Sequence, residues 1–478
     1  MTILIGVDQG TSGTRAVAFD QRLRPLGESY QPAHVNHPQL GWIENDADET
    51  VATVEHALGD LTAQLEGEVT AVGLDNEGET VVAWDAETLR PLAPAIVWGS
   101  RRSQPIVERL EASGHGPRIQ ELSGLPLDPY FSATKIRWLV ENDAAVAAAA
   151  TERRLRAGTL DAYVCARLGD GARTEPSTAG RTQLQALAAP GSWHPELLEL
   201  HGIDPAWLPP IGPSAGPFGK LAGLPLRALL VDQTASLAGH GCLLPGMAKA
   251  TYGTGIFLLQ QAGEAPPAQT GRLLSVVAWE LTEGRPSYAL DGGVFSAGTV
   301  LTWLRDGLGA FQDPAQSEAM ANSVPDTDGV QFLPALAGMG APWWRADARA
   351  VVAGITASTT RAHIVRAALD ALCFRVRDLV DALPVRPDVL RVDGGLTANG
   401  YLVQRQADVL DMPVEVAGMP ETTALGAAAA AGVGAGLFTI DDLAELAAGG
   451  RRFQPGDVRG AGADYAAWRR FAERASLL

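Results

Sequence analysis

The sequence contains little cysteine and no long apolar stretch. Its cysteines, Cys165, Cys242 and Cys373, are too few and too widely spaced for a disulfide framework or a zinc site. The most apolar tract, residues 423–438, is mainly alanine and glycine and too short to span a bilayer, so it predicts a close-packed helix. The first residues lack a basic segment and reach Asp8 early, unlike a signal peptide. We therefore expect a cytoplasmic protein.

Positive charge is also scarce. The net charge is −18 and there is no run of five like charges, which argues against nucleic acid or an anionic membrane as a partner. Hydrophobic residues make up 46% and charged residues 19%, as in ordinary globular enzymes. The length of 478 residues predicts about two to four domains. A homodimer is the assembly that we consider for such a chain.

The opening stretch, Leu4–Asp20, predicts a hairpin with a longer loop, because two short apolar runs flank a segment of glycines and hydroxyl residues. Asp8 ends the first run and Arg15 follows the loop. Backbone N–H groups and hydroxyls beside a cation suit phosphate oxygens, and a nearby carboxylate suits hydrated Mg²⁺. The alternative is a solvated hairpin with a capping aspartate.

The same pattern recurs later in the chain. Val231-Asp232-Gln233 closes an apolar strand as Val7-Asp8-Gln9 does, and Tyr252–Leu259 predicts a second glycine-threonine hairpin. Val389–Asn399 predicts a strand, an Asp-Gly-Gly turn and the start of a helix. Strands are also expected at 69–75 and 81–85, and helices at 102–112 and 133–143. We expect two α/β domains facing each other, with acidic and glycine-rich strand ends between them. A Pro/Gly-rich stretch at 208–226 places their boundary after residue 226.

Two longer motifs identify a family. "YFSATKIRWLVEN" (Tyr130–Asn142) and "GITASTTRAHIVRAALD" (Gly354–Asp370) resemble the two signatures of the FGGY carbohydrate kinases. Within that family the chain is most similar to glycerol kinases, in motifs such as "DQGTSGTRA", "GMAKATYGTG", "AGMGAPWW" and "LRVDGGLTANGYL". The resemblance covers residues 3 to about 440. It implies two ribonuclease-H-like domains of the actin/hexokinase type around a deep hinged cleft, with the acceptor and phosphate loop in residues 1–226 and the nucleotide in residues 227–478.

The resemblance also implies the roles of individual residues. Asp8 and Asp232 would hold Mg²⁺, Asp8 through water. The residues that would contact ATP are Thr11, Ser12, Thr14, Arg15, Gly253, Thr254, Gly255, Gly298, Gly394, Gly395 and Asn399. The residues that would contact the acceptor are Glu79, Trp98, Tyr130, Asp232, Gln233 and Phe257. Taken alone, Trp98 and Phe257 fit a hydrophobic core equally well.

The reaction implied is transfer of phosphate from ATP to a primary hydroxyl of a small polyol. An alcohol needs a base as attack develops, and Asp232 at a strand end is the candidate, against the alternative of a helix cap. Glycerol, giving glycerol 3-phosphate, is the first candidate acceptor; erythritol, ribitol, xylulose and ribulose are the alternatives. A different class, an actin-type ATP-binding chaperone, filament protein or regulator, would need a partner-binding part that the motifs do not indicate.

The chain departs from the glycerol-kinase pattern at Asn76-Glu77-Gly78-Glu79-Thr80. Those kinases normally read Asn-Gln-Arg-Glu-Thr, so Gly78 replaces an arginine that would bind substrate hydroxyls. Val231 likewise replaces the usual glycine before Asp-Gln. Two interpretations follow: another donor compensates, or a larger acceptor uses the vacated space, in which case restoring an arginine at 78 would tighten glycerol binding.

Overall fold

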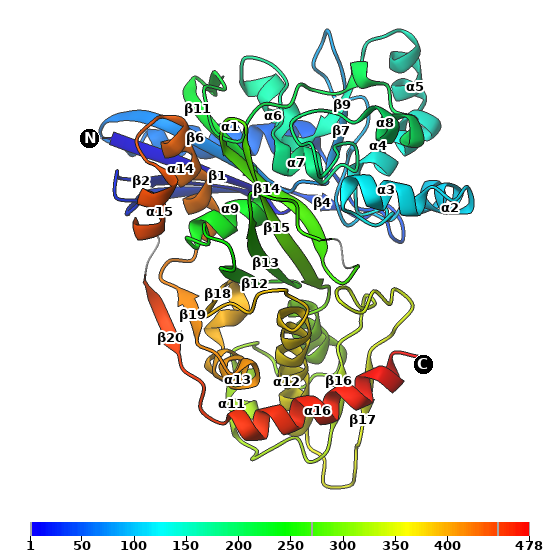
Figure 1. The fold of residues 1–478 in the computed structure, drawn as a ribbon, viewed down its shortest axis with the longest axis vertical. Coiled ribbons are helices and arrows are strands. Elements are labelled where there is room, and N and C mark those ends of the chain that lie inside the picture. The colour runs from blue at the N-terminus through cyan, green and yellow to red at the C-terminus, as the bar shows by residue number, and fades with distance from the viewer. Residues whose placement is uncertain (1, 269–270, 447–448, 478) are drawn as a thin grey trace.

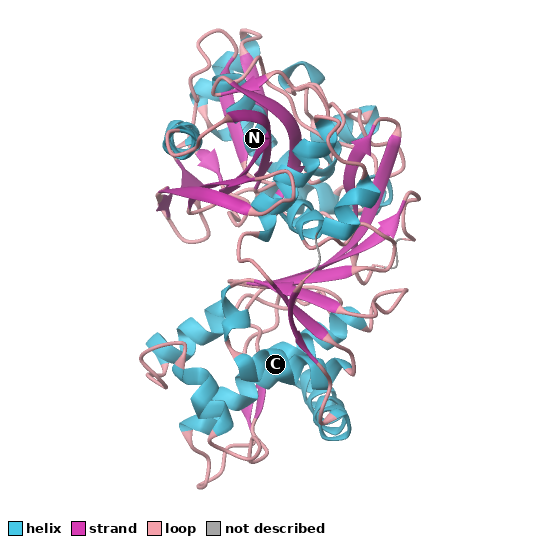
Figure 2. Ribbon diagram, turned by 90° about the vertical axis from the view of Figure 1, so that its left-hand side faces the viewer, coloured by secondary structure: helices cyan, strands magenta, loops and turns pink. Residues whose placement is uncertain are grey.

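The computed structural model describes residues 2–268, 271–446 and 449–477, which form two lobes built on mixed sheets (Figures 1 and 2). The six-stranded sheet of the first lobe has the order β10 (Lys220–Leu221), β11 (Leu224–Val231), β6 (Glu68–Asn76), β1 (Thr2–Gly10), β2 (Gly13–Phe19) and β3 (Pro25–Pro32). The seven-stranded sheet of the second has the order β14 (Leu274–Thr282), β15 (Arg285–Val294), β13 (Ile256–Gly263), β12 (Ala248–Tyr252), β18 (Leu390–Asp393), β19 (Val414–Ala417) and β20 (Gly450–Phe453).

Both large sheets follow one topology. In the first, β1 pairs antiparallel with β2 and β2 with β3, while β6 runs parallel to β1 and β11 parallel to β6. In the second, β12, β13 and β15 form the antiparallel part, and β18 and β19 the parallel part. The predicted duplication of one α/β topology is therefore confirmed.

Smaller elements complete each lobe. The first adds a five-stranded sheet, β4 (Val35–Asn36), β5 (Glu44–Asn45), β8 (Ala95–Ile96), β7 (Val81–Asp85) and β9 (Leu155–Thr159), and the helices α1 (Ala47–Thr62), α2 (Gln104–Ala112), α3 (Gly116–Ser123), α4 (Ser132–Asn142), α5 (Ala144–Thr151), α6 (Leu160–Leu168), α7 (Pro176–Gly180) and α8 (Pro195–His201). Later in the chain come α9 (Asp232–Gly239), α10 (Gly298–Thr302), α11 (Gln316–Asn322), β16 (Gln331–Leu333), β17 (Val351–Ala353), α12 (Arg361–Val380), α13 (Gly400–Leu410), α14 (Thr422–Gly434), α15 (Ile440–Leu446) and α16 (Val458–Ala475). The strands and helices expected from the apolar patterns are present.

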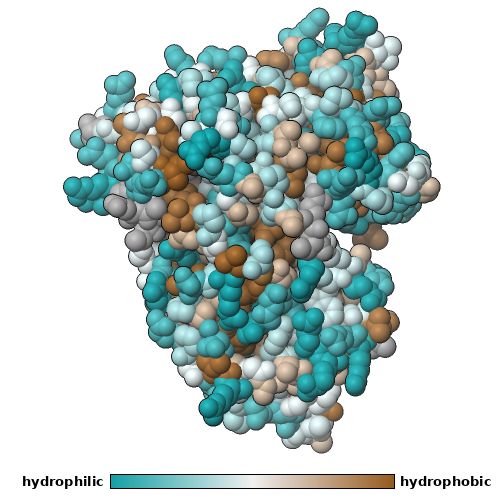
Figure 3. Space-filling model, viewed as in Figure 1, coloured by the Kyte–Doolittle hydropathy of each residue, from teal (hydrophilic) through white to brown (hydrophobic). Residues whose placement is uncertain are grey.

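Figure 3 shows the two lobes in space-filling form, with hydrophilic residues spread over both and apolar residues visible at the waist.

The alanine- and glycine-rich tract forms α14, which returns the chain to the first lobe and packs on β1, β6 and β11 (Figure 1). A Cβ atom added at Gly6 of β1 would lie 1.8 Å from the carbonyl oxygen of Ala424. A Cβ at Gly426 would lie 1.8 Å from the carbonyl oxygen of Ala235 in α9. Backbone therefore contacts backbone at both crossings, and this close approach requires glycine. The prediction of a close-packed helix is confirmed.

The opening hairpin is tighter than the predicted longer loop. β1 and β2 remain paired as far as Gly10 and Gly13, so only Thr11 and Ser12 form the turn. Gly13 has φ +154°, and a Cβ there would lie 2.4 Å from the carbonyl oxygen of Gln31. The apolar runs end before the strands do, because the last strand residues carry the polar groups of the turn.

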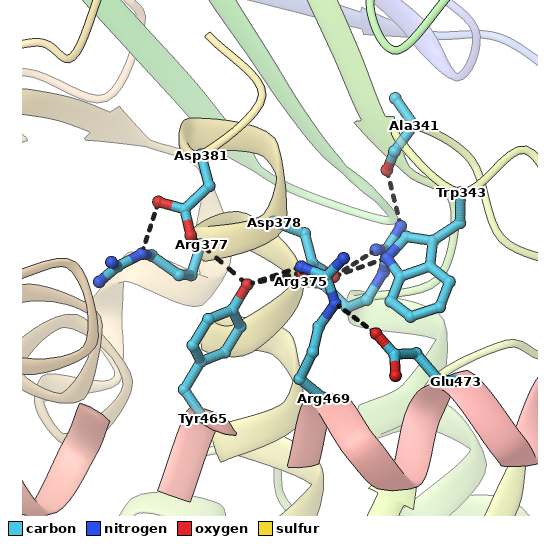
Figure 4. Close-up of polar contacts among 9 residues, drawn as sticks. All are labelled: Ala341, Trp343, Arg375, Arg377, Asp378, Asp381, Tyr465, Arg469 and Glu473. Carbon is cyan, nitrogen blue, oxygen red and sulfur yellow. Dashed lines mark hydrogen bonds and ion pairs between the residues drawn. The ribbon is translucent and has the colours of Figure 1, made fainter. Parts of the chain in front are cut away.

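The "AGMGAPWW" motif forms a loop that is fixed to the core of the second lobe through Asp378 of α12 (Figure 4). Its buried carboxylate accepts hydrogen bonds from Trp343 Nε1 at 2.7 Å and Arg375 Nη1 at 2.8 Å. From α16, Tyr465 Oη donates to it at 2.8 Å and Arg469 Nη1 at 3.1 Å. One buried carboxylate thus joins the loop, α12 and the C-terminal helix.

Candidate active site

Three aspartates meet where adjacent strands of the first sheet end. Asp8 on β1 is directly opposite Asp75 on the parallel strand β6, and Asp232 begins α9 immediately after β11. Burial, followed by repulsion from Asp232, raises the pKa of Asp8 to about 7. Burial likewise raises the pKa of Asp75 well above its ordinary value and raises that of Asp232. Carboxylates this close cannot all be charged without a compensating cation or proton.

The hairpin turn lies beside this cluster. Thr11 Oγ1 donates to Glu77 and accepts a 3.0 Å hydrogen bond from Trp98 Nε1, and Ser12 is exposed. Arg15 forms ion pairs of 3.2 Å with Glu28 and with Glu421. Arg15 is paired with Asp8 across the hairpin, so the turn and this arginine flank the strand end that carries Asp8.

Thr14 does not lie with the other hairpin residues that were predicted to contact ATP. It is fully buried, and its hydroxyl lies 2.8 Å from that of Thr53 in α1. In the register of the hairpin Thr14 is paired with Gln9, whereas Arg15 is paired with Asp8. Successive strand residues point to opposite faces, so the Thr14 hydroxyl packs the helix and does not join the turn.

The predicted acceptor residues of the first lobe lie together. The rings of Trp98 and Tyr130 meet edge to face with centroids 5.8 Å apart. Lys135 Nζ in α4 donates to the carbonyl oxygen of Glu79 at 3.1 Å and also to that of Tyr130. These bonds join α4 to the acceptor wall, by which we mean Glu79, Trp98 and Tyr130. Phe257 is on β13 of the second sheet, opposite Gly293 of β15. Aromatic faces and a buried carboxylate form a surface suited to a carbon chain carrying hydroxyl groups.

Val231 and Arg181 lie close to the position where a side chain at residue 78 would begin. A Cβ atom at Gly78 would lie 2.4 Å from Val231 Cγ2 and 3.3 Å from Arg181 Cγ. The two departures from the family pattern thus compensate one another, since the larger residue at 231 occupies the room that the smaller residue at 78 leaves. An arginine at residue 78 would therefore collide with Val231 unless residue 231 were also made smaller. The interpretation that the acceptor is larger than glycerol stays a prediction.

Gln233 is held beside Asp232 by a lysine that the motifs did not single out. Asp232 Oδ1 accepts a 2.6 Å hydrogen bond from the backbone N–H of Gln233. Buried Lys249 on β12 donates to Gln233 Oε1 and to Thr251 Oγ1, each at 2.9 Å. Burial lowers the pKa of Lys249, while nearby Asp393 and Asp232 oppose that shift. Lys249 therefore places a cation between the strand-end carboxylates of the two lobes.

A cavity of about 250 Å³ opens in the second lobe at the end of β12. Four of the predicted nucleotide residues line it, together with residues not predicted: Gly253, Thr254, Gly298 and Gly395, with Tyr252, Thr299, Thr302 and Leu396. An added Cβ at Gly298 would lie 2.8 Å from the Gly253 carbonyl oxygen, so the turn and α10 meet without side chains between them.

The other nucleotide residues predicted in the second lobe are Gly255, Gly394 and Asn399, which do not line this cavity. The carbonyl oxygen of Gly255 accepts a 2.9 Å hydrogen bond from the N–H of Gly253, and Gly394 has φ +90°. Asn399 is the N-cap of α13: its Oδ1 accepts from the N–H of Leu402 at 3.0 Å, and its Nδ2 donates to Ser317 Oγ at 3.1 Å. These contacts fix the backbone of the turn and the start of the helix.

Comparison with known proteins matches both lobes to one family. The model of the FGGY family of carbohydrate kinases, N-terminal domain, matches residues 3–228, and the C-terminal domain model matches residues 248–435. The chain belongs to the FGGY family of carbohydrate kinases. The resemblance inferred from the motifs is thereby confirmed, and so is the two-domain α/β fold.

Relatives of this FGGY kinase extend over its whole length. It is 41% identical to a glycerol kinase of Symbiobacterium thermophilum, covering 99% of this chain and 98% of the relative. It is also 41% identical to a glycerol kinase of Aromatoleum aromaticum, with 99% of each covered. The crystal structure of Plasmodium falciparum glycerol kinase with ADP superposes with a TM-score of 0.92 at 29% identity, covering 100% of this chain and 99% of that one. A ligand-bound xylulose kinase of Lactobacillus acidophilus, 20% identical, shares the fold with a TM-score of 0.88.

Two further findings concern metal-binding groups and membrane-spanning helices. Within the described ranges, no group of three or more histidine, cysteine, aspartate or glutamate side chains is arranged to hold a metal ion directly. None of the helices in the described part of the chain has the length and apolar composition needed to cross a membrane. Any divalent cation at Asp8 and Asp75 would therefore be held largely through water and substrate oxygens.

Proposed function

We propose that the protein transfers the terminal phosphate of ATP to a primary hydroxyl of a small polyol, with glycerol as the first candidate acceptor. The observation that carries this proposal is the convergence of Asp8, Asp75 and Asp232 at one sheet edge. The first lobe also contributes the hydroxyl turn and the aromatic pair Trp98 and Tyr130, and the second lobe contributes the cavity. Full-length similarity to glycerol kinases supports glycerol.

Asp232 is the proposed general base. Its carboxyl group lies partly exposed at the start of α9, and desolvation there raises its pKa, which favours taking a proton from an attacking alcohol. Hydrogen bonds within residues 232–233 and the nearby cation of Lys249 keep the carboxylate oriented. The helix-cap alternative is weaker, because among the described residues the backbone N–H that donates to the Asp232 carboxylate is that of its neighbour Gln233.

ATP would occupy the second lobe, with its phosphates directed at the hairpin turn of the first. Gly253, Thr254, Gly298 and Gly395 line the cavity there, and backbone without Cβ atoms permits close approach of phosphate oxygens. The related structure from Plasmodium falciparum contains ADP, which supports a nucleotide in this fold. Residues 1–226 and 227–478 remain our proposal for the acceptor and nucleotide parts, although residue 226 falls within β11.

Mg²⁺ fits the carboxylate cluster. Both oxygens of Asp75 are buried without a hydrogen-bond partner among the described residues, and the pKa of Asp8 is raised to about 7, so a cation would relieve both. Asp8, Asp75 and Asp232 would hold it largely through water molecules and the phosphate oxygens of ATP. When bound, the ion would supply positive charge to the phosphates of ATP. Arg15 and the Thr11 and Ser12 turn would position the transferred group.

The test is an ATP-turnover screen of the purified protein with glycerol, erythritol, ribitol, xylulose, ribulose and dihydroxyacetone. We expect the highest kcat/KM with glycerol. ATP turnover that is independent of every acceptor would favour an actin-type ATPase instead. A clear preference for a ketose would show that the protein is an FGGY kinase whose acceptor is a ketose and not glycerol. A cytoplasmic location and a homodimer remain predictions of the same proposal.

A further inference from the structure

A buried guanidinium with unused donors lies in the wall assigned to the acceptor. Arg181 directly follows α7, and its side chain is 2% exposed. Its Nη2 donates to Asp291 Oδ2 at 2.6 Å, whereas Nη1 is 3.6 Å from Glu79 Oε1, too far for a hydrogen bond. Its Nε has no hydrogen-bond partner among the described residues. Such a group is costly to bury unless another partner completes it.

Three of the residues proposed to contact the acceptor lie within reach of the charge of Arg181. Its positive charge lowers the pKa of Glu79, of Tyr130 and of Asp232, against the raising effect of burial in each case. It therefore lies near the proposed base as well as near the aromatic wall. Among the described ion pairs, Arg181 is the cation within 4 Å of the Glu79 carboxylate.

The position of Arg181 is set by both lobes. Asp291 is on β15 of the second sheet, whose neighbour β14 packs on α7 of the first lobe. Val231 Cγ2 and Arg181 Cγ together occupy the space that a side chain at residue 78 would need. An arginine from a different part of the chain thus supplies a guanidinium beside Glu79 where Gly78 cannot.

We propose that Arg181 binds the acceptor and determines its specificity, with Asp291 as the residue that positions it. This inference rests on the proposed polyol kinase activity. A hydroxyl group that approaches Arg181 and Glu79 from the side would accept a hydrogen bond from the guanidinium and donate one to the carboxylate, bridging two atoms that lie 3.6 Å apart. The acceptor would then be a compound with adjacent hydroxyls, because one hydroxyl must reach this pair while another faces Asp232.

The first test is Arg181→Lys, which keeps the charge but removes the fork of donors. Loss of a charge-assisted hydrogen bond should raise the KM for glycerol by about tenfold to about a hundredfold, with the KM for ATP nearly unchanged. The matched control is Arg405→Lys, a buried arginine paired with Asp370 in the second lobe. It should lower the melting temperature without affecting either KM.

The second test is Asp291→Asn, which changes charge but hardly any volume and so preserves packing if Arg181→Lys does not fold. It should raise the KM for glycerol severalfold and leave that for ATP in place. An unchanged glycerol KM in either folded variant, or an equal rise in both KM values, would overturn the inference. If the wild-type protein itself turns over no polyol, the proposed function has failed, and calorimetric titration of glycerol into wild type and variants still tests the binding role of Arg181.

Discussion

At the scale of single residues, the account depends on the partly exposed carboxylate of Asp232 at the start of α9. We predict that Asp232→Asn lowers kcat by about a hundredfold to about ten-thousandfold, because the amide cannot accept the acceptor proton. The amide oxygen can still accept from the N–H of Gln233, so folding should be retained. A coupled ADP assay and a thermal melt measure the two effects. Turnover close to wild type in the folded variant would refute the assignment of the base.

A second residue-scale prediction concerns stability in acid. Burial lowers the pKa of His201 in α8 to about 3, and neither ring nitrogen has a partner among the described residues. Below about pH 6.5 the unfolded chain therefore binds a proton at His201, whereas the folded protein does so only near pH 3. The free energy of unfolding is thus unaffected above about pH 6.5 and decreases as the pH falls toward about 3. By pH 5 the loss should reach about 2 kcal/mol.

Urea unfolding of His201→Leu at pH 8 and pH 5 measures this loss. The variant should be less sensitive to acid than wild type by about that amount. His56→Gln, at an exposed histidine in α1, is the control and should behave as wild type. Equal acid sensitivity of wild type and His201→Leu would show that the ring is protonated in the folded protein.

The sequence predicts many of the site residues but not their partners. Asp8 and Asp232 are evident because each ends an apolar strand, and Asp75 ends the predicted strand 69–75 in the same way, so it could have been found. Arg181 could not, since its role depends on Glu79 and Asp291, which lie far from it in the chain and meet it only after both lobes fold. The orientation of Thr14 depends on hairpin register, which composition does not specify.

At the scale of elements, glycine decides how closely α14 can approach its neighbours. We predict that Gly426→Ala destabilises the protein by at least about 3 kcal/mol, because the new methyl would lie 1.8 Å from the carbonyl oxygen of Ala235 and backbone would have to move. Gly59→Ala in α1 is the matched control, as no atom lies within 4 Å of its added Cβ. It should instead stabilise by about 0.5–1 kcal/mol. Chemical denaturation measures the free energy of unfolding of both variants. Equal changes in the two would contradict the close backbone contact between α14 and α9.

Element types follow from apolar periodicity, and their connections do not. The strands and helices predicted from the patterns appear as β6, β7, α2, α4 and α14. The turn between β1 and β2 is shorter than predicted, because polar residues at Gln9 and Thr14 still pair in the ladder. The Pro/Gly-rich stretch ends inside β11, a strand of the first sheet, so composition marks the region of the boundary but not the edge of the sheet.

At the scale of the whole molecule, the two lobes divide the substrates between them. We predict that Gly395→Leu raises the KM for ATP by more than about tenfold and changes the KM for glycerol little, because the side chain would project into the cavity of the second lobe. It should fold, since an added Cβ at Gly395 meets no atom within 4 Å. Gly394→Leu is the contrasting variant: with φ +90° and a Cβ 2.5 Å from the Tyr252 carbonyl oxygen, it should fold poorly. Steady-state kinetics with each substrate varied decides; an unchanged ATP KM would contradict the placement.

The repeated topology explains why the fold was predictable from three strand ends. Asp8 lies near the end of β1 and Asp232 directly follows β11 in the first lobe, and Asp393 ends β18 in the second. What those ends do depends on how the lobes meet, which no local pattern contains.

The most direct test of the central claim is to identify the product. Purified protein, ATP, Mg²⁺ and glycerol are incubated together, and the phosphorus species are followed by ³¹P NMR beside an identical sample of Asp232→Asn. The account predicts glycerol 3-phosphate and ADP in equal amounts from the wild-type protein and almost none from the variant. Inorganic phosphate in place of glycerol 3-phosphate, or equal product from both proteins, would contradict it.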